Sequence, residues 1–249
     1  MKNIFATAAS VFVWGFAVPA MAGSSDSTVS QIGIANHVEV EQLQGGSANN
    51  DNDSGVTQNG NSNYGYVNQG GNSIRNLSIL NQIGDGNVAD VDQVGDGNDI
   101  NDSFAQQTGN GNYARVNQGD LINNNKSELY QAGNYNGATV NQGGANGVNT
   151  GDNKSYVYQY ENYDSVLVNQ GGAGAVNTSI IVQDLDDVLP AWGNYAQVTQ
   201  NGSSTNISNA YQYGDNNDAY VAQGAASGVT NTSTIVQTGA SNFTSVGQH

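Results

Sequence analysis

The chain repeats a glutamine-anchored pattern nine times, and this repeat limits its fold more than any other feature. Residues 76–93 show the pattern as N-x-S-x-L-x-Q-x-G-x-x-N-x-A-x-V-x-Q. The nine units lie near residues 25–42, 52–69, 76–93, 101–118, 125–142, 153–170, 177–200, 206–223 and 231–248. Repetition of this kind is typical of solenoids, in which each unit stacks on its neighbours to build one continuous core.

Amide side chains recur at three fixed places in the units. The first glutamines are Gln31, Gln58, Gln82, Gln107, Gln131, Gln159, Gln183, Gln212 and Gln237. The second glutamines are Gln42, Gln69, Gln93, Gln118, Gln142, Gln170, Gln200, Gln223 and Gln248. The third place, after the central turn, holds Asn36, Asn63, Asn87, Asn112, Asn136, Asn194, Asn217 and Asn242. We expect each set to form one structural ladder along the stack.

The spacing within a unit predicts two strands joined by a short turn. Fixed and variable residues alternate on both sides of the turn, and successive side chains of a strand point to opposite faces. The fixed face should point inward and the variable face outward. A glycine in seven of the nine turns permits positive φ. We therefore predict an all-β fold, a two-sheet β-solenoid of nine strand–turn–strand repeats with cross-β geometry.

Stacking like residues on like resolves the problem of burying so many polar groups. A lone buried amide is costly, whereas amides in a column can hydrogen-bond one another. Serines and valines should align in the same way, and aliphatic residues such as Leu80 and Val91 should interdigitate between the sheets. A disordered Asn/Gln-rich linker would need no such register, so we set that interpretation aside.

Composition and charge argue against several classes of function. The chain has 21 acidic and 5 basic residues, a net charge of −16, which predicts no nucleic-acid partner. It has no cysteine, and its two histidines, His37 and His249, lie in the first and last units. We therefore expect no enzymatic activity, metal site, cofactor or small-molecule substrate.

The first 22 residues have the pattern of a cleaved signal peptide. Lys2 precedes a mostly apolar stretch over residues 4–18, and Ala20-Met21-Ala22 matches the small-x-small cleavage pattern. That stretch is shorter than the roughly 20 apolar residues of a transmembrane helix. We predict that residues 1–22 are removed on export and that residues 23–249 form the secreted β-solenoid domain.

The unit resembles the curlin repeat, from which the subunits of curli amyloid fibres are built. That family's signature reads S-x5-Q-x-G-x2-N-x-A-x3-Q. From the first glutamine onward, residues 82–93, 107–118, 131–142 and 212–223 match it fully. Two departures stand out. Eight units open with Asn in place of Ser, and the first unit starts almost at the predicted mature terminus, where curlins carry a segment that guides secretion.

The resemblance implies a structural subunit of a bacterial, extracellular, cell-surface amyloid fibre that assembles head to tail into biofilm matrix. It also implies three partners: further copies of the chain, a nucleator subunit and an outer-membrane secretion pore. The regular last unit favours the major subunit over the minor nucleator. The alternatives are that nucleator and a monomeric surface-binding β-solenoid adhesin.

Two units depart from the pattern. In the sixth, Glu161 replaces the turn glycine and Asp164 replaces the asparagine. In the seventh, six extra residues lie within residues 184–193. One interpretation is a longer turn that loops outward at little cost. The other is that part of this segment slows premature assembly, with the gatekeeper residues Asp184, Asp186, Asp187 and Pro190.

Overall fold

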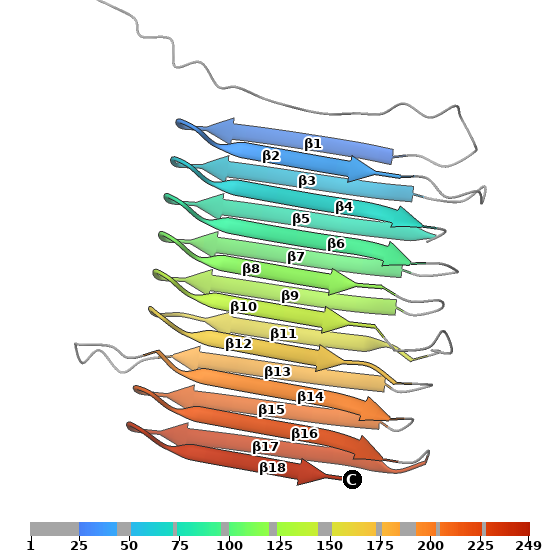
Figure 1. Ribbon diagram of the computed structural model, residues 1–249, viewed down its shortest axis with the longest axis vertical. Coiled ribbons are helices and arrows are strands. Elements are labelled where there is room, and N and C mark those ends of the chain that lie inside the picture. Colours follow the sequence, from blue (N-terminus) through green and yellow to red (C-terminus); the bar gives the residue numbers. More distant parts are fainter. Residues whose placement is uncertain are drawn as a thin grey trace, which may run out of the picture.

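The computed structural model describes residues 25–43, 51–71, 74–95, 100–119, 124–143, 151–172, 176–184, 193–202, 205–225 and 228–249. In these residues the regular structure consists of 18 strands, so the predicted all-β fold is confirmed. The strands form two parallel sheets of nine strands each, stacked as a β-solenoid (Figure 1). Within the same residues there is no helix that is long and apolar enough to cross a membrane.

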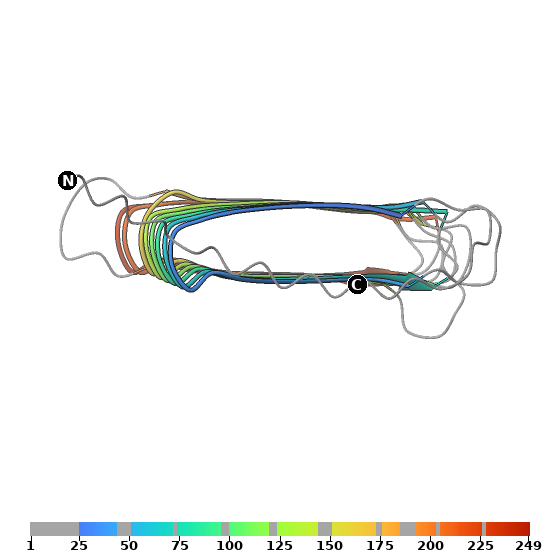
Figure 2. The same ribbon diagram turned by 90° about the horizontal axis from the view of Figure 1, so that it is seen from above.

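Odd-numbered strands form one sheet, called sheet A, and even-numbered strands form sheet B. Sheet A contains β1 (Ser25–Ile32), β3 (Asp51–Asn59), β5 (Arg75–Ile83), β7 (Ile100–Thr108), β9 (Asn124–Ala132), β11 (Asn153–Gln159), β13 (Val176–Asp184), β15 (Thr205–Tyr213) and β17 (Thr230–Thr238). Sheet B contains β2 (His37–Gln42), β4 (Tyr64–Gly71), β6 (Val88–Gly95), β8 (Tyr113–Gln118), β10 (Gly137–Gln142), β12 (Ser165–Gln170), β14 (Tyr195–Gly202), β16 (Asp218–Ala225) and β18 (Phe243–Gln248). The two strands of one unit form a rung. Seen along the stack, the sheets face each other as two flat layers (Figure 2).

Equivalent residues of successive units lie beside one another in every parallel pairing. Ser54 pairs with Ser78, Gln58 with Gln82, and Val67 with Val91. The inward face carries the fixed residues, as the alternation predicted. Leu80 and Gln82 are fully buried, whereas the outward residue between them, Asn81, is not. Glutamines, asparagines, serines and valines therefore stand in columns.

The core between the sheets is a thin aliphatic seam. Sheet A contributes one aliphatic column, which includes the fully buried Leu80, Leu129 and Ile181 and the small Ala105 and Ala210. Sheet B contributes a valine column and a column of smaller residues, such as Ala89 and Ala114. At Leu80 the large side chain faces a small residue, because a Cβ atom on Gly65 in sheet B would lie 3.0 Å from it. Burying each such aliphatic side chain contributes about 1.5–3 kcal/mol.

The turns confirm the role predicted for glycine. Gly84 has φ 112°, and a Cβ atom placed there would lie 2.0 Å from the carbonyl oxygen of Gly109 in the next rung. A side chain at this position would therefore be strained and would clash with the neighbouring turn. Two residues later the chain again takes positive φ, as at Gly86 and Gly111.

Candidate functional site: the polar ladders and the end rungs

The predicted glutamine columns form two unbroken hydrogen-bond ladders. In the first, each Nε2 donates to the Oε1 of the following rung, from Gln31 to Gln237, over 2.7–3.0 Å. In the second, the same direction holds from Gln42 to Gln248, over 2.8–2.9 Å. Both ladders therefore run with a fixed polarity along the stack.

Ladder glutamines also tie the two sheets together. The second N–H of Gln82 donates to the backbone oxygen of Tyr64 in β4, at 3.0 Å. In the other ladder, Gln93 donates to the backbone oxygens of Leu77 and Asn101 in sheet A, at 3.0 and 2.9 Å. One glutamine side chain thus donates both along its own ladder and to backbone oxygens of the opposite sheet.

Serine columns align but do not form ladders. The hydroxyl oxygens of Ser54, Ser78, Ser103, Ser127, Ser155, Ser179, Ser208 and Ser233 are buried and have no hydrogen-bond partner among the described residues. The reason is geometric. Successive rungs lie about 4.8 Å apart, which exceeds the reach of a hydroxyl-to-hydroxyl bond. An amide spans this gap because its nitrogen and oxygen are separate atoms.

Asparagines form two further ladders of the opposite polarity. In the turns, the Nδ2 of Asn87 donates to the Oδ1 of Asn63 at 3.2 Å and to the backbone oxygen of Gly109 at 2.8 Å. The second ladder consists of the asparagines that open the units, which were not among the predicted site residues. It runs from Asn231 back to Asn52, with each Nδ2 donating to the preceding rung over 2.8–3.0 Å.

Asp164 interrupts the turn ladder at the sixth rung. Its carboxyl group is 1% exposed, and its Oδ1 accepts the backbone N–H of Asn194 at 2.8 Å. Its Oδ2 and the Nδ2 of Asn194 have no hydrogen-bond partner among the described residues. Burial raises the pKa of Asp164 to about 7, with smaller contributions from the nearby Glu161 and Asp184 carboxylates, although the Asn194 hydrogen bond opposes the rise.

The gatekeeper residues are only partly described. Asp184 ends β13, pairs with Tyr213 and accepts the N–H of Gly214 through its backbone oxygen at 3.0 Å. Asp184 therefore belongs to the sheet. Asp186, Asp187 and Pro190 lie outside the described residues, so their gatekeeping role stays a prediction.

The two end rungs leave ladder groups without partners. No described residue donates to the Oε1 of Gln31 or Gln42, and none donates to the Oδ1 of Asn231 or Asn242. The core is also open there, because Val29 and Val246 are only partly buried, whereas their neighbours Val56 and Val221 are 2% and 3% exposed. Among the described strands, each end of the stack is a sheet edge that pairs on one side only, the kind of surface that recruits another strand.

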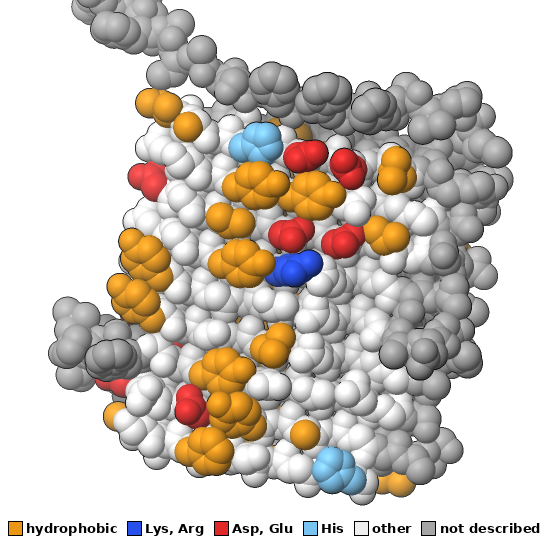
Figure 3. Space-filling view, viewed as in Figure 1, with side chains coloured by type: hydrophobic (Ala, Val, Ile, Leu, Met, Phe, Trp, Pro, Cys, Tyr) orange, Lys and Arg blue, Asp and Glu red, His pale blue; other side chains and the backbone are white. Residues whose placement is uncertain are grey.

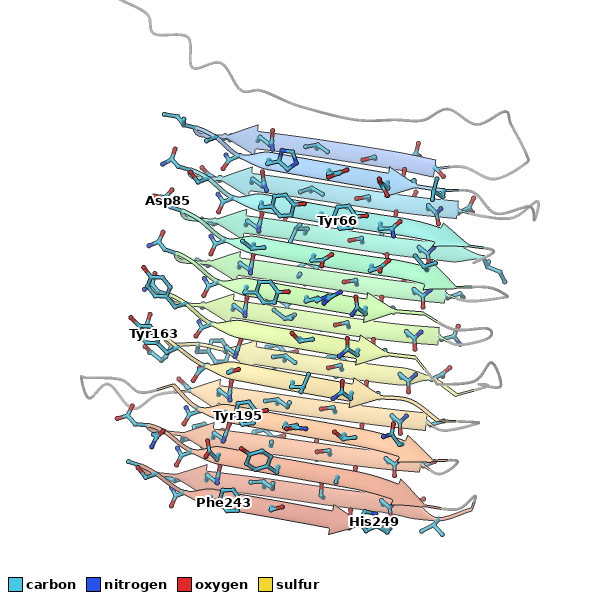
Figure 4. The ribbon with its side chains drawn as sticks, in the orientation of Figure 1. Tyr66, Asp85, Tyr163, Tyr195, Phe243 and His249 are labelled. Carbon is cyan, nitrogen blue, oxygen red and sulfur yellow. The ribbon has the colours of Figure 1, made fainter. Side chains whose placement is uncertain are left out.

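The outward faces are more ordered than the sequence indicated. An outward amide ladder joins Asn117, Asn141 and Asn169 in sheet B, with two bonds of 2.8 Å. Rings also lie side by side along the rungs, as in Tyr195–Tyr220–Phe243, where neighbouring centroids are 5.5 Å apart and the planes are tilted by 46° and 43° (Figure 4). Aligning the units at each outward position would have found the Asn117 column, since all three asparagines precede a second glutamine.

Charge gathers on one part of the outer face of sheet B. Glu39 and Glu41 of β2 and Asp90 and Asp92 of β6 point outward near the N-terminal end (Figure 3). Burial, followed by the Asp90 charge, raises the pKa of Asp92. Even so, no group of three or more ligating side chains among the described residues could hold a metal ion.

Comparison with known proteins identified no relative. No family model, no curated protein and no solved structure matches the chain.

Proposed function

We propose that the chain is a structural fibre subunit that assembles by stacking its ninth rung on the first rung of another copy. The observation that carries this proposal is the complementarity of the two ends. The C-terminal rung offers asparagine oxygens, and its glutamines occupy the donor end of their ladders. The N-terminal rung offers the glutamine oxygens that such donors would meet.

Ladder polarity favours head-to-tail contact over contact between two like ends. In a head-to-tail junction the Gln237 amide meets the Gln31 oxygen of the next copy, and Gln248 meets Gln42. If two N-terminal ends met, glutamine oxygens would face glutamine oxygens. Buried acceptors without donors each cost about 1–3 kcal/mol. A contact that repeats without closing produces a filament.

The charges of the two end rungs also favour head-to-tail contact. The first rung carries Asp26, Glu39 and Glu41, whereas residues 230–249 contain no acidic residue and no Lys or Arg. Stacking the ninth rung on the first rung therefore places a neutral edge against an acidic one. Two acidic edges in contact would repel each other, as like charges across a contact do.

Extending the observed register predicts which residues meet at the junction. Because β15 pairs with β17 and β1 with β3 in register, β17 should place Thr234 beside Thr28 of the next copy. Both positions are exposed and point outward. Neighbouring Cα atoms would lie about 4.8 Å apart, within the range that a disulfide bridges.

The test uses paired cysteines in a chain that has none of its own. A variant carrying Thr28→Cys and Thr234→Cys should form interchain disulfides on mild oxidation after incubation, giving a ladder of oligomers on a non-reducing gel. The matched control carries Thr28→Cys and Thr232→Cys. Its cysteines would lie about 8 Å apart in the proposed register, beyond disulfide reach.

The outcomes separate the candidate functions. Selective crosslinking of the first pair, with a fibre reflection near 4.7 Å, supports the fibre subunit. Equal crosslinking of both pairs would reject the register. A β-rich chain that stays monomeric would reject stacking and favour the surface-binding adhesin.

The biological setting is the remaining part of the proposal. Repeats matching the curlin signature from the first glutamine onward support a curli-type amyloid subunit, exported after cleavage near residue 22 and built into an extracellular matrix. The regular ninth rung supports the major subunit over the nucleator. Export can be tested by sequencing the N-terminus of the protein recovered outside cells, which should begin at residue 23.

A further inference from the structure

Two exposed tyrosines stack face to face at the turns of the fifth and sixth rungs. The ring centroids of Tyr135 and Tyr163 are 5.5 Å apart and the ring planes are 12° apart. Tyr135 is 60% exposed and Tyr163 is 57% exposed, at the turn edge of the solenoid (Figure 4). A Cβ atom on Gly111 in the preceding turn would lie 2.8 Å from the Tyr135 ring, so that glycine leaves room for the stack.

Both tyrosines occupy backbone conformations that bulky residues avoid. Tyr135 has φ 60° and Tyr163 has φ 65°. The equivalent turns use small or turn-forming residues at this place: Ala35, Ser62, Gly86, Gly111, Asn216 and Ser241. Left-handed backbone is uncommon for an aromatic residue, and such outliers gather at functional positions. Two of them side by side point to a use for this pair.

We propose that Tyr135 and Tyr163 form an oxidative crosslinking site, at which a dityrosine bond joins the fifth and sixth rungs. The oxidant would be hydrogen peroxide acting through a peroxidase. Each phenol loses one electron and one proton to give a phenoxyl radical. A carbon–carbon bond forms between the ring positions next to the two hydroxyl groups, and both rings regain aromaticity by releasing these ring hydrogens to the phenolic oxygens. The two hydrogen atoms lost overall reduce one peroxide to two water molecules.

This pair is better placed for the reaction than the other tyrosines. Tyr130 and Tyr158 also stack, at 5.3 Å and 10°, but they lie half-buried on the face of sheet A, with Phe104 against Tyr130. Tyr195 and Tyr220 are tilted by 46°. Tyr160 is 48% exposed and stacks on Tyr158, but at 6.4 Å and against a half-buried ring. Among the described tyrosine pairs, stacking combines with exposure of both rings at Tyr135 and Tyr163, so that an oxidant has access and the rings have room to rotate into bonding distance.

The bond would join the rungs where the polar ladder fails. Tyr163 precedes Asp164, whose carboxyl group breaks the column of turn asparagines. A crosslink between Tyr135 and Tyr163 would close a loop of 28 residues, since 163 − 135 = 28. It would therefore hold the fifth and sixth rungs together at the interrupted turn.

The experiment oxidises the dilute, freshly folded full chain with peroxidase and limiting peroxide. Cleavage after acidic residues releases Tyr163 in residues 162–164 and Tyr158 in residues 153–161, while Tyr135 lies in residues 129–152. Mass spectrometry should find 129–152 joined to 162–164, lighter by two hydrogen atoms, as the main crosslinked product. Tyr163→Phe and Tyr135→Phe should each abolish it, and Tyr158→Phe should leave it unchanged.

Three results would overturn the site: survival of the product in Tyr135→Phe, tyrosine pairs crosslinked in the same proportions as in the denatured chain, or no dityrosine fluorescence. Circular dichroism of each variant confirms that the strands are intact. Both tyrosines lie in one chain, so the result does not depend on whether copies stack into a fibre.

Discussion

The fourth and sixth turns differ in one buried side chain, which is Asn112 in the fourth and Asp164 in the sixth. The comparison shows which hydrogen bonds of the turn depend on the side-chain amide and which a carboxyl group can also make. In the fourth turn, Asn112 donates to Asn87 and to Gly133, at 3.1 and 2.9 Å, and accepts the N–H of Asn136 at 3.0 Å. In the sixth, Asp164 keeps both backbone contacts, donating its N–H to Asn136 at 2.9 Å. The side-chain donation of this residue is lost, and the Nδ2 of Asn194 and the Oδ2 of Asp164 have no partner among the described residues. The stack tolerates this because the neighbouring glutamine ladders cross the sixth rung unbroken.

The largest predicted effect on the free energy of unfolding tests whether the glutamine ladders are equally important in the fourth and sixth rungs. Gln107→Leu in a regular rung would remove the acceptor that Gln82 uses in the ladder and the donor to the Oε1 of Gln131 and to the backbone oxygen of Val88. We expect a loss of roughly 3–6 kcal/mol in the free energy of unfolding. Gln159→Leu in the sixth rung should cost a similar amount, because its three hydrogen bonds are the same. Denaturant titration of both variants measures this, and a near-neutral Gln159→Leu would contradict it.

The next effect is the pH dependence that Asp164 creates. Its pKa is about 7 in the folded chain, against an ordinary value of 3.8. Because the folded value is the higher one, the folded chain loses stability as the pH rises from about 4 to about 7. The difference of about three pKa units corresponds to a loss on the order of 4 kcal/mol. Asp164→Asn should therefore stabilise the chain at pH 8 and change little at pH 4.

A reverse substitution provides the matched control. Asn112→Asp places a carboxyl group in a regular turn and should create the same fall in stability between pH 4 and pH 7. Unfolding titrations at pH 4, 6 and 8 would compare the native chain with both variants. If Asp164→Asn keeps the native chain's slope, the sixth turn is not its source.

The third effect concerns the regular turns. Gly109 has φ 115°, and a Cβ atom there would lie 1.8 Å from the carbonyl oxygen of Gly133. Gly109→Ala should cost at least about 2 kcal/mol, from backbone strain and the displaced neighbour. Gly137→Ala is the control, because its Cβ would meet nothing within 4 Å, and we expect a change within about 0.5 kcal/mol. Equal losses in thermal unfolding for the two variants would reject the steric explanation.

The strand–turn–strand order, the register and the glutamine ladders followed from the sequence because the fixed residues obey a period of two. Gln82 and Leu80 could be placed inward from spacing alone. Other features depend on relations between units. The opening asparagines from Asn52 to Asn231 could also be placed in an inward column, and the structure adds that their ladder runs against the glutamine ladders. The outward column at Asn117 was missed because most outward positions vary from unit to unit. Unpaired serine hydroxyls such as Ser78 Oγ were not predicted. Recurrence of a residue in every unit shows that its copies align, but it does not show whether their polar atoms lie within hydrogen-bond distance.

The smallest effect tests whether the tyrosine stack exists for stability. Tyr163→Gly would relieve left-handed backbone strain of about 1–2 kcal/mol, yet it would remove a ring pair worth about 0.5–1.5 kcal/mol. The greater freedom of glycine in the unfolded chain costs a further 0.5–1 kcal/mol or so. These contributions nearly cancel, so the free energy of unfolding should change by less than about 1 kcal/mol while the dityrosine product disappears. A loss above about 2 kcal/mol would instead make the stack a structural contact and remove the reason to look for another use of two strained tyrosines.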